Sequence, residues 1–143
     1  MNIFASKATL RTIIILSYAV AFYSSHNMVW GVDSHNQANN AEEMRLVKEA
    51  EHTLALINKQ IADASCDDSS QCAALAIGHR ACGGPSAFLA YSTKNTDVPL
   101  LTRLAAKHSA IEKQLNKLRG TVSVCEILLP PPVICRDKHC QIQ

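Results

Sequence analysis

The cysteines are the residues of this sequence with the clearest chemistry. All six lie between residues 66 and 140, at Cys66, Cys72, Cys82, Cys125, Cys135 and Cys140. An even number of cysteines in an exported chain predicts a disulfide framework, so we expect three disulfides. Many pairings of six cysteines are possible, and their spacing does not choose among them.

The same sulfur atoms could instead ligate a metal ion. Cys135, His139 and Cys140 lie close together in the sequence, and His79 is near Cys82. Zinc sites usually contain short paired spacings such as C-x2-C, which this chain lacks. A zinc-binding domain is therefore an alternative only, and we assign no metal ligand and no cofactor.

A second alternative is a small extracytoplasmic enzyme that uses Cys82 or His108. Cys82 would need a thiolate and a positioned base such as His79 or His108. His108 lies between Leu104 and Ile111 on an apolar helix face and could act as a base or as a pH switch. We expect it instead at the solvent end of that face, bonded to a backbone carbonyl or to water. We assign no catalytic residue and expect no enzymatic activity.

The glycines next to Cys82 define a candidate binding loop. Cys82-Gly83-Gly84-Pro85 must form a tight turn, because glycine permits positive φ and proline fixes its own φ. A disulfide at Cys82 could anchor this loop, and Pro85 lowers the entropy that the loop loses on binding. The candidate binding residues are therefore Gly83, Gly84, Pro85 and Ser86. The simpler alternative is a structural turn that leads into a strand.

This region also carries a family resemblance. The run IGHRACGGPSAFLAYS, followed by SVC and a closing CRDKHC, resembles a group of small exported bacterial proteins of unknown function. In that group a C-G-G-P turn precedes a Y-S segment, and a final cysteine pair closes the chain. The resemblance covers roughly residues 66–140. It implies export and disulfide formation, and no activity is carried over from it.

The first residues have the layout of a secretory signal peptide. Two basic residues precede an apolar segment at residues 12–22, and Ala19-Val20-Ala21 fits an A-x-A cleavage site. We therefore expect a signal peptide over residues 1–21, with cleavage as late as residue 31 as the alternative. Polar residues interrupt the apolar run before it is long enough to span a membrane. The mature protein is expected to be periplasmic or secreted, without a membrane anchor.

Removal of this signal peptide would leave a formally neutral chain. The full sequence has 14 Lys+Arg and 12 Asp+Glu, and the signal contains Lys7 and Arg11, so 12 residues of each sign remain. A balanced surface gives no electrostatic reason to bind nucleic acid or an anionic membrane. We therefore expect another exported protein as the partner.

Two segments have the residue pattern of packed helices. Residues 32–40 are polar without apolar periodicity, and residues 22–40 are predicted to form a flexible polar lead. The first helix is then expected over residues 41 to about 64, with Asn40 as its N-cap. The second helix is expected over Val98–Arg119, where Asp97 precedes it and Gly120 follows it as a left-handed C-cap.

The two helices are predicted to pack against each other as an antiparallel hairpin. Their net charges are opposite, 3 − 5 = −2 over residues 41–64 and 5 − 1 = +4 over residues 98–119. This difference in charge favours pairing of the two helices within one chain, and hence a monomer. The alternative is that their apolar faces pair between chains. Apolar residues recur at alternating spacings of three and four. They are Val47, Ala50, Leu54, Ile57, Ile61 and Ala64 in the first helix, and Leu101, Leu104, His108, Ile111, Leu115 and Leu118 in the second.

Short strands are expected around the cysteines. Residues 73–77 and 88–91 are predicted strands, and residues 133–135 and 140–142 are predicted to form a terminal hairpin around a four-residue loop. Residues 121–129 are β-branched and favour extended backbone before the three prolines that follow.

These elements predict an α+β fold. An antiparallel two-helix hairpin would pack on a small antiparallel β-sheet, cross-linked by disulfides, as a single domain over residues 41–143. The function expected of such a chain is that of an exported, disulfide-stabilised protein-binding or inhibitor-like module.

Overall fold

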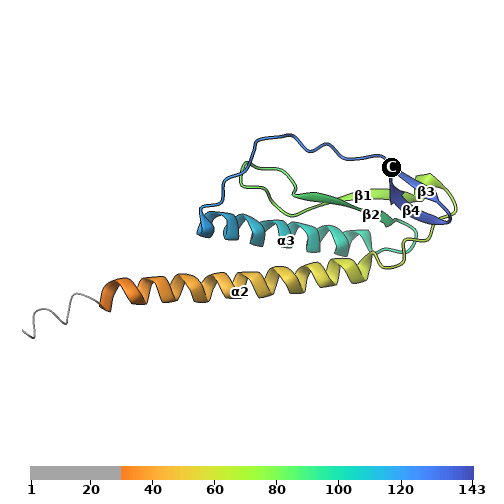
Figure 1. Ribbon diagram of the computed structural model, residues 1–143. Coiled ribbons are helices and arrows are strands. Elements are labelled where there is room, and N and C mark those ends of the chain that lie inside the picture. Colours follow the sequence, from red (N-terminus) through yellow and green to blue (C-terminus); the bar gives the residue numbers. More distant parts are fainter. Residues whose placement is uncertain (1–29) are drawn as a thin grey trace, which may run out of the picture. The chain divides into compact units, whose positions relative to one another are not determined.

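The computed structural model describes residues 30–143 (Figure 1), so the predicted signal peptide and residues 22–29 lie outside the described residues. Residues Ala41–Gln143 form one compact unit. The architecture is α+β, as predicted. In chain order the elements are α2 (Trp30–Gln60), the 3-10 helix η1 (Ser69–Gln71), β1 (Cys72–Ile77), β2 (Ala87–Ser92), α3 (Val98–Arg119), β3 (Val133–Arg136) and β4 (His139–Ile142).

Helix α2 begins earlier than the sequence pattern predicts. Its first residue is Trp30, so residues 30–40 are helical where a flexible lead was predicted, and Asn40 is not the N-cap. These residues contain no proline. Once a helix is nucleated, each added residue gains a backbone hydrogen bond at little further cost. The helix can therefore extend through residues 30–40 although these residues form no apolar face.

Helix α2 also ends earlier than predicted, at Gln60. The residues after it leave the helix because they pair with the C-terminal tail. Ala64 O accepts a hydrogen bond from Cys140 N at 2.8 Å, and Cys66 N donates to Lys138 O at 3.0 Å. Backbone pairing with a distant segment thus replaces the last predicted helical turn.

Helix α3 has the predicted bounds because its sequence contains both caps. The Asp97 side chain accepts a hydrogen bond from Leu100 N at 3.0 Å. Gly120 adopts the left-handed conformation, with φ of 60°, and its N–H donates to the carbonyls of the last helical turn. These bonds give partners to a backbone N–H in the first turn and to backbone carbonyls in the last turn, which the helix itself leaves without partners.

The two helices pack against each other in an antiparallel arrangement within one chain. Leu46 of α2 forms a buried cluster with Ile111 and Leu115 of α3. Two ion pairs join the helices: Glu49 Oε1 lies 2.9 Å from Lys107 Nζ, and Glu43 Oε1 lies 2.8 Å from Arg119 Nε. Exposed pairs of this kind contribute at most about 1 kcal/mol each, so the apolar seam holds the helices together.

Residues 30–143 contain two separate antiparallel sheets, whereas a single small sheet was predicted. Strands β1 and β2 pair from Cys72 opposite Ser92 to Ile77 opposite Ala87, and β3 pairs with β4. The β1–β2 sheet packs on the helices through a second buried cluster. Its members are Ile57, Leu75, Tyr91, Leu101 and Ala105.

The turn between β3 and β4 has two residues, not the four that the sequence predicts. Asp137 and Lys138 have φ of 51° and 64°. Two successive residues with positive φ give the turn whose twist matches that of the strands. Arg136 and His139 consequently extend the two strands toward the turn.

Truncation of Ile111 tests the seam. Ile111 is 5% exposed between α2 and α3, so Ile111→Ala is expected to lower the free energy of unfolding by about 2–4 kcal/mol. The matched control is Val122→Ala, because Val122 is 91% exposed and its truncation should change stability by less than about 0.5 kcal/mol. Urea denaturation measures both. Equal effects would contradict packing of the seam within the chain.

Candidate functional site

All six cysteines form disulfides, which confirms the predicted number. The pairs are Cys66–Cys135, Cys72–Cys140 and Cys82–Cys125, and none of the six is free. Each bond joins the region before β2 to the C-terminal tail. The sequence could not supply this pairing, because it depends on which segments the fold brings together.

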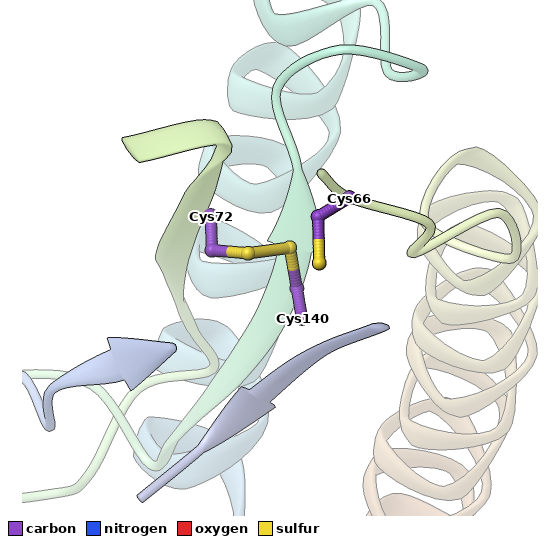
Figure 2. A group of neighbouring side chains, drawn as sticks. All are labelled: Cys66, Cys72 and Cys140. Carbon is purple, nitrogen blue, oxygen red and sulfur yellow. A yellow bond between two sulfur atoms is a disulfide. The ribbon is translucent and has the colours of Figure 1, made fainter. Parts of the chain in front are cut away.

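Two of the disulfides lie next to each other in the interior. The Sγ atoms of Cys66, Cys72 and Cys140 all lie within 4.8 Å of one another. Figure 2 shows the Cys72–Cys140 disulfide with the Cys66 side chain beside it. His139, which the zinc alternative included, is not in this group, and its Nδ1 lies 2.9 Å from Asp137 O. Zinc ligands are thiolates. In the oxidised protein Cys72 is instead bonded to Cys140, and Cys66 is bonded to Cys135.

Cys82 is bonded to Cys125 and therefore has no thiolate. A nucleophilic cysteine must be ionised to attack a substrate. The enzyme alternative thus loses its proposed nucleophile in this form of the protein.

His108 lies in the interior, so its expected position at the solvent end of the seam is wrong. It is 4% exposed, and its Nδ1 has no hydrogen-bond partner among the described residues. Its Nε2 lies 3.9 Å from Glu112 Oε1. The reason for its burial is its place in the middle of α3, because the helix face that packs there carries His108 inward with Ala105 and Ile111.

Glu112 holds the loop that follows β1. Its Oε2 accepts hydrogen bonds from His79 N at 2.6 Å and from Ser86 Oγ at 3.1 Å. One turn further along α3, Asn116 Nδ2 donates to His79 O at 2.5 Å. Residues four apart share a helix face, so α3 fixes both ends of the loop. Our sequence interpretation missed Glu112, although it is the only acidic residue in α3.

The candidate binding loop is a tight turn, as predicted. Gly83 and Gly84 have φ of 102° and 77°. Arg80 N donates to Gly84 O at 3.1 Å, and Gly83 N donates to Arg80 O at 2.8 Å. Ser86 differs from its neighbours because its side chain bonds Glu112. Gly84 and Ser86 are exposed, and Gly83 and Pro85 are half-buried.

A second exposed segment lies beside this loop. Residues 121–132, which we call the strap, run from α3 to β3 without regular secondary structure (Figure 1). No backbone group of residues 122–129 hydrogen-bonds to the described part of the chain. Ser123 Oγ accepts a hydrogen bond from Cys82 N at 3.1 Å. The strap and residues 83–85 line a shared cavity of about 380 Å³.

The strap exposes large apolar side chains. Val122, Val124, Ile127 and Leu129 are 91%, 77%, 84% and 73% exposed. Leu128, at 39%, contributes to the cavity together with Cys125. The β-branched pattern predicted extended backbone here, but it could not show that the segment would lie outside both sheets.

The acidic pair after Cys66 has structural contacts. Asp67 Oδ2 accepts a hydrogen bond from Lys94 Nζ at 2.6 Å, which lowers the pKa of Asp67. Asp68 Oδ1 accepts from Ser70 N at 2.7 Å, and this backbone hydrogen bond lowers the pKa of Asp68. The small stabilisation they provide is present above the unfolded pKa of about 4 and is lost as the pH falls through the lower folded pKa.

The chain matches no protein-family model, no curated protein and no solved structure. Among the described residues, no helix has the length and apolarity needed to cross a membrane. The fold and the cross-links by themselves define a small, disulfide-rich α+β protein.

Two glycines in the loop region provide a matched test of the Glu112 contacts. Gly78 and Gly84 have nearly identical φ values, 76° and 77°. A Cβ at Gly78 would come within 2.6 Å of both Glu112 Oε2 and Ser86 Oγ, whereas a Cβ at Gly84 would meet nothing within 4 Å.

Both alanine variants should therefore lose about 1 kcal/mol because of the left-handed backbone. Gly78→Ala should lose about 1–3 kcal/mol more, because the clash displaces the carboxylate and leaves its donors unpaired. Unfolding in urea measures the difference. If the two variants lose the same stability, the Glu112 contacts do not hold the loop.

Proposed function

We propose that this protein is exported and works in the periplasm or outside the cell. Its three disulfides support this proposal, because such bonds persist in oxidising compartments and are reduced in the cytosol. The signal-like layout of residues 1–21 supports it independently.

Within that compartment, the function supported best is binding to another exported protein. One observation carries this proposal: the Cys82–Cys125 disulfide joins residues 83–85 to the strap, and the two segments line one cavity. We name the combined surface of residues 83–85 and 122–129 the loop–strap surface. It brings the predicted binding loop together with a segment more than thirty residues later in the chain.

The energetics of the strap favour binding. Its apolar side chains are exposed in the free protein, and burying them against a partner would yield about 25 cal/mol per Å². Contiguous exposed apolar surface is typical of interaction sites. The disulfide and Pro85 restrict the loop–strap surface before binding, so less conformational entropy is lost on association.

The same contacts argue against catalysis and against self-association through the helices. Cys82 is bonded to Cys125, and His108 is buried without contact to a nucleophile among the described residues. The apolar seams of α2 and α3 pack against each other, so we propose that the protein is a monomer.

Capture experiments test the loop–strap surface. The oxidised protein, immobilised and exposed to the exported proteins of its native host, should retain a partner, and Val124→Asp should reduce its recovery at least about tenfold because a charge replaces a buried apolar contact. The control Met44→Asp alters a 61% exposed residue of α2 and should leave recovery unchanged. Equal recovery with both folded variants would place the binding surface elsewhere.

A further inference from the structure

The strap has backbone groups that are available to a partner. It runs along the outside of the molecule between α3 and β3, apart from both sheets (Figure 1). The backbone groups of residues 122–129 have no partner in the described part of the chain. Recognition of an extended segment by strand addition requires such free N–H and C=O groups. A strand within one of the sheets could not offer them on both edges.

Ile127 is the residue of the strap best suited to anchor it in a partner. Ile127 is the most exposed large apolar side chain between Cys125 and Cys135, at 84%, compared with 39% for Leu128 and 73% for Leu129. Ile127 and Leu128 both contribute to the wall of the cavity. Leu129 is also exposed, but Pro130 follows it, and proline has no N–H to donate in a cleft. Ile127 thus combines exposure with an ordinary peptide bond on its carboxyl side.

Covalent anchors lie on both sides of the Ile127–Leu128 bond. Cys125 is bonded to Cys82, and the residues after Leu128 are held through Cys135 and Cys140. Hydrolysis of this bond would consume one water molecule and leave a carboxylate on Ile127 and an amine on Leu128. The two pieces would stay joined by disulfides. Their high effective concentration favours re-formation of the bond over release.

We propose that the strap occupies the substrate cleft of an endopeptidase that cleaves after aliphatic residues, with Ile127 in the primary specificity pocket. The proposal deepens the proposed function, because it uses the loop–strap surface and names the class of partner. Three features select a protease cleft over the flat edge of a partner sheet. The strap's backbone groups at residues 122–129 are free of partners among the described residues, its most exposed large apolar side chain between Cys125 and Cys135 is the aliphatic Ile127, and its ends are cross-linked.

A change of specificity tests this assignment. The oxidised protein should inhibit subtilisin and elastase in assays with chromogenic peptides, competitively with substrate. Ile127→Arg should weaken that inhibition at least about tenfold, which corresponds to 1.4 kcal/mol. The same variant should acquire inhibition of trypsin, whose pocket accepts arginine. Met44→Arg, at a 61% exposed position of α2 outside the loop–strap surface, is the control and should inhibit neither more nor less than the wild type.

Mass spectrometry of the inhibited mixture tests the covalent step. Cleavage after Ile127 should add the mass of one water to the intact protein, and the two pieces should separate only after reduction. The proposal is overturned if neither subtilisin nor elastase is inhibited, if Ile127→Arg fails to inhibit trypsin, or if the strap is digested into pieces that separate without reductant. A wild-type dimer that Ile127→Arg dissociates would also overturn it, because the occupant would then be a second copy.

The capture experiment distinguishes failure of the endopeptidase proposal from failure of protein binding at the loop–strap surface. If Val124→Asp abolishes partner capture while no endopeptidase is inhibited, the loop–strap surface binds a protein of another class. If capture is unaffected as well, both proposals fail.

Discussion

Three covalent bonds between residues 66–82 and residues 125–140 are the constraint on which the rest of this structure depends. After α3 ends, the chain contains only the strap and a short hairpin, and most of its large apolar side chains remain exposed. Such a tail buries too little surface to offset the entropy of ordering it. The disulfides close segments of 69, 68 and 43 residues, and loops of that size correspond to about 4 kcal/mol each in the chain-entropy description. The tail is therefore positioned by cross-linking rather than by a core of its own.

Helix α3 is the element that connects this framework to the candidate site. One part of its surface packs on α2 and on the β1–β2 sheet through Leu101, Ile111 and Leu115. Another part holds the loop after β1 through Glu112 and Asn116. The loop in turn contains Cys82, which anchors the strap. A rigid helix thus determines where both segments of the loop–strap surface lie, although neither segment has regular secondary structure.

Local signals in the sequence were sufficient for some elements and insufficient for others. The Asp97 side chain and the Gly120 backbone supply hydrogen-bond partners at the two ends of α3, so its bounds could be predicted from the sequence. The start of α2 could not, because polar residues continue a helix without leaving an apolar pattern. The number of disulfides followed from the count of cysteines, whereas their pairing depends on contacts between segments about forty to seventy residues apart. His108 was placed at the solvent end because a lone imidazole favours water, but its position in the middle of a packed face buries it.

The site shows the same division between local and distant information. The turn at Gly83 and Gly84 was predictable from backbone sterics alone. The role of Glu112 was not, because its partners His79 and Ser86 come from a different part of the chain. The strap was predicted to be extended, and only the three-dimensional arrangement shows that it pairs with neither sheet and lies against residues 83–85.

The most direct test of this account is the disulfide connectivity of the native protein, mapped by proteolysis and mass spectrometry without reduction. The account predicts peptides that join Cys66 to Cys135, Cys72 to Cys140 and Cys82 to Cys125. Cys82 in a free form that reacts with an alkylating reagent, or bonded to any cysteine other than Cys125, would contradict it, because the loop and the strap would then no longer form one surface.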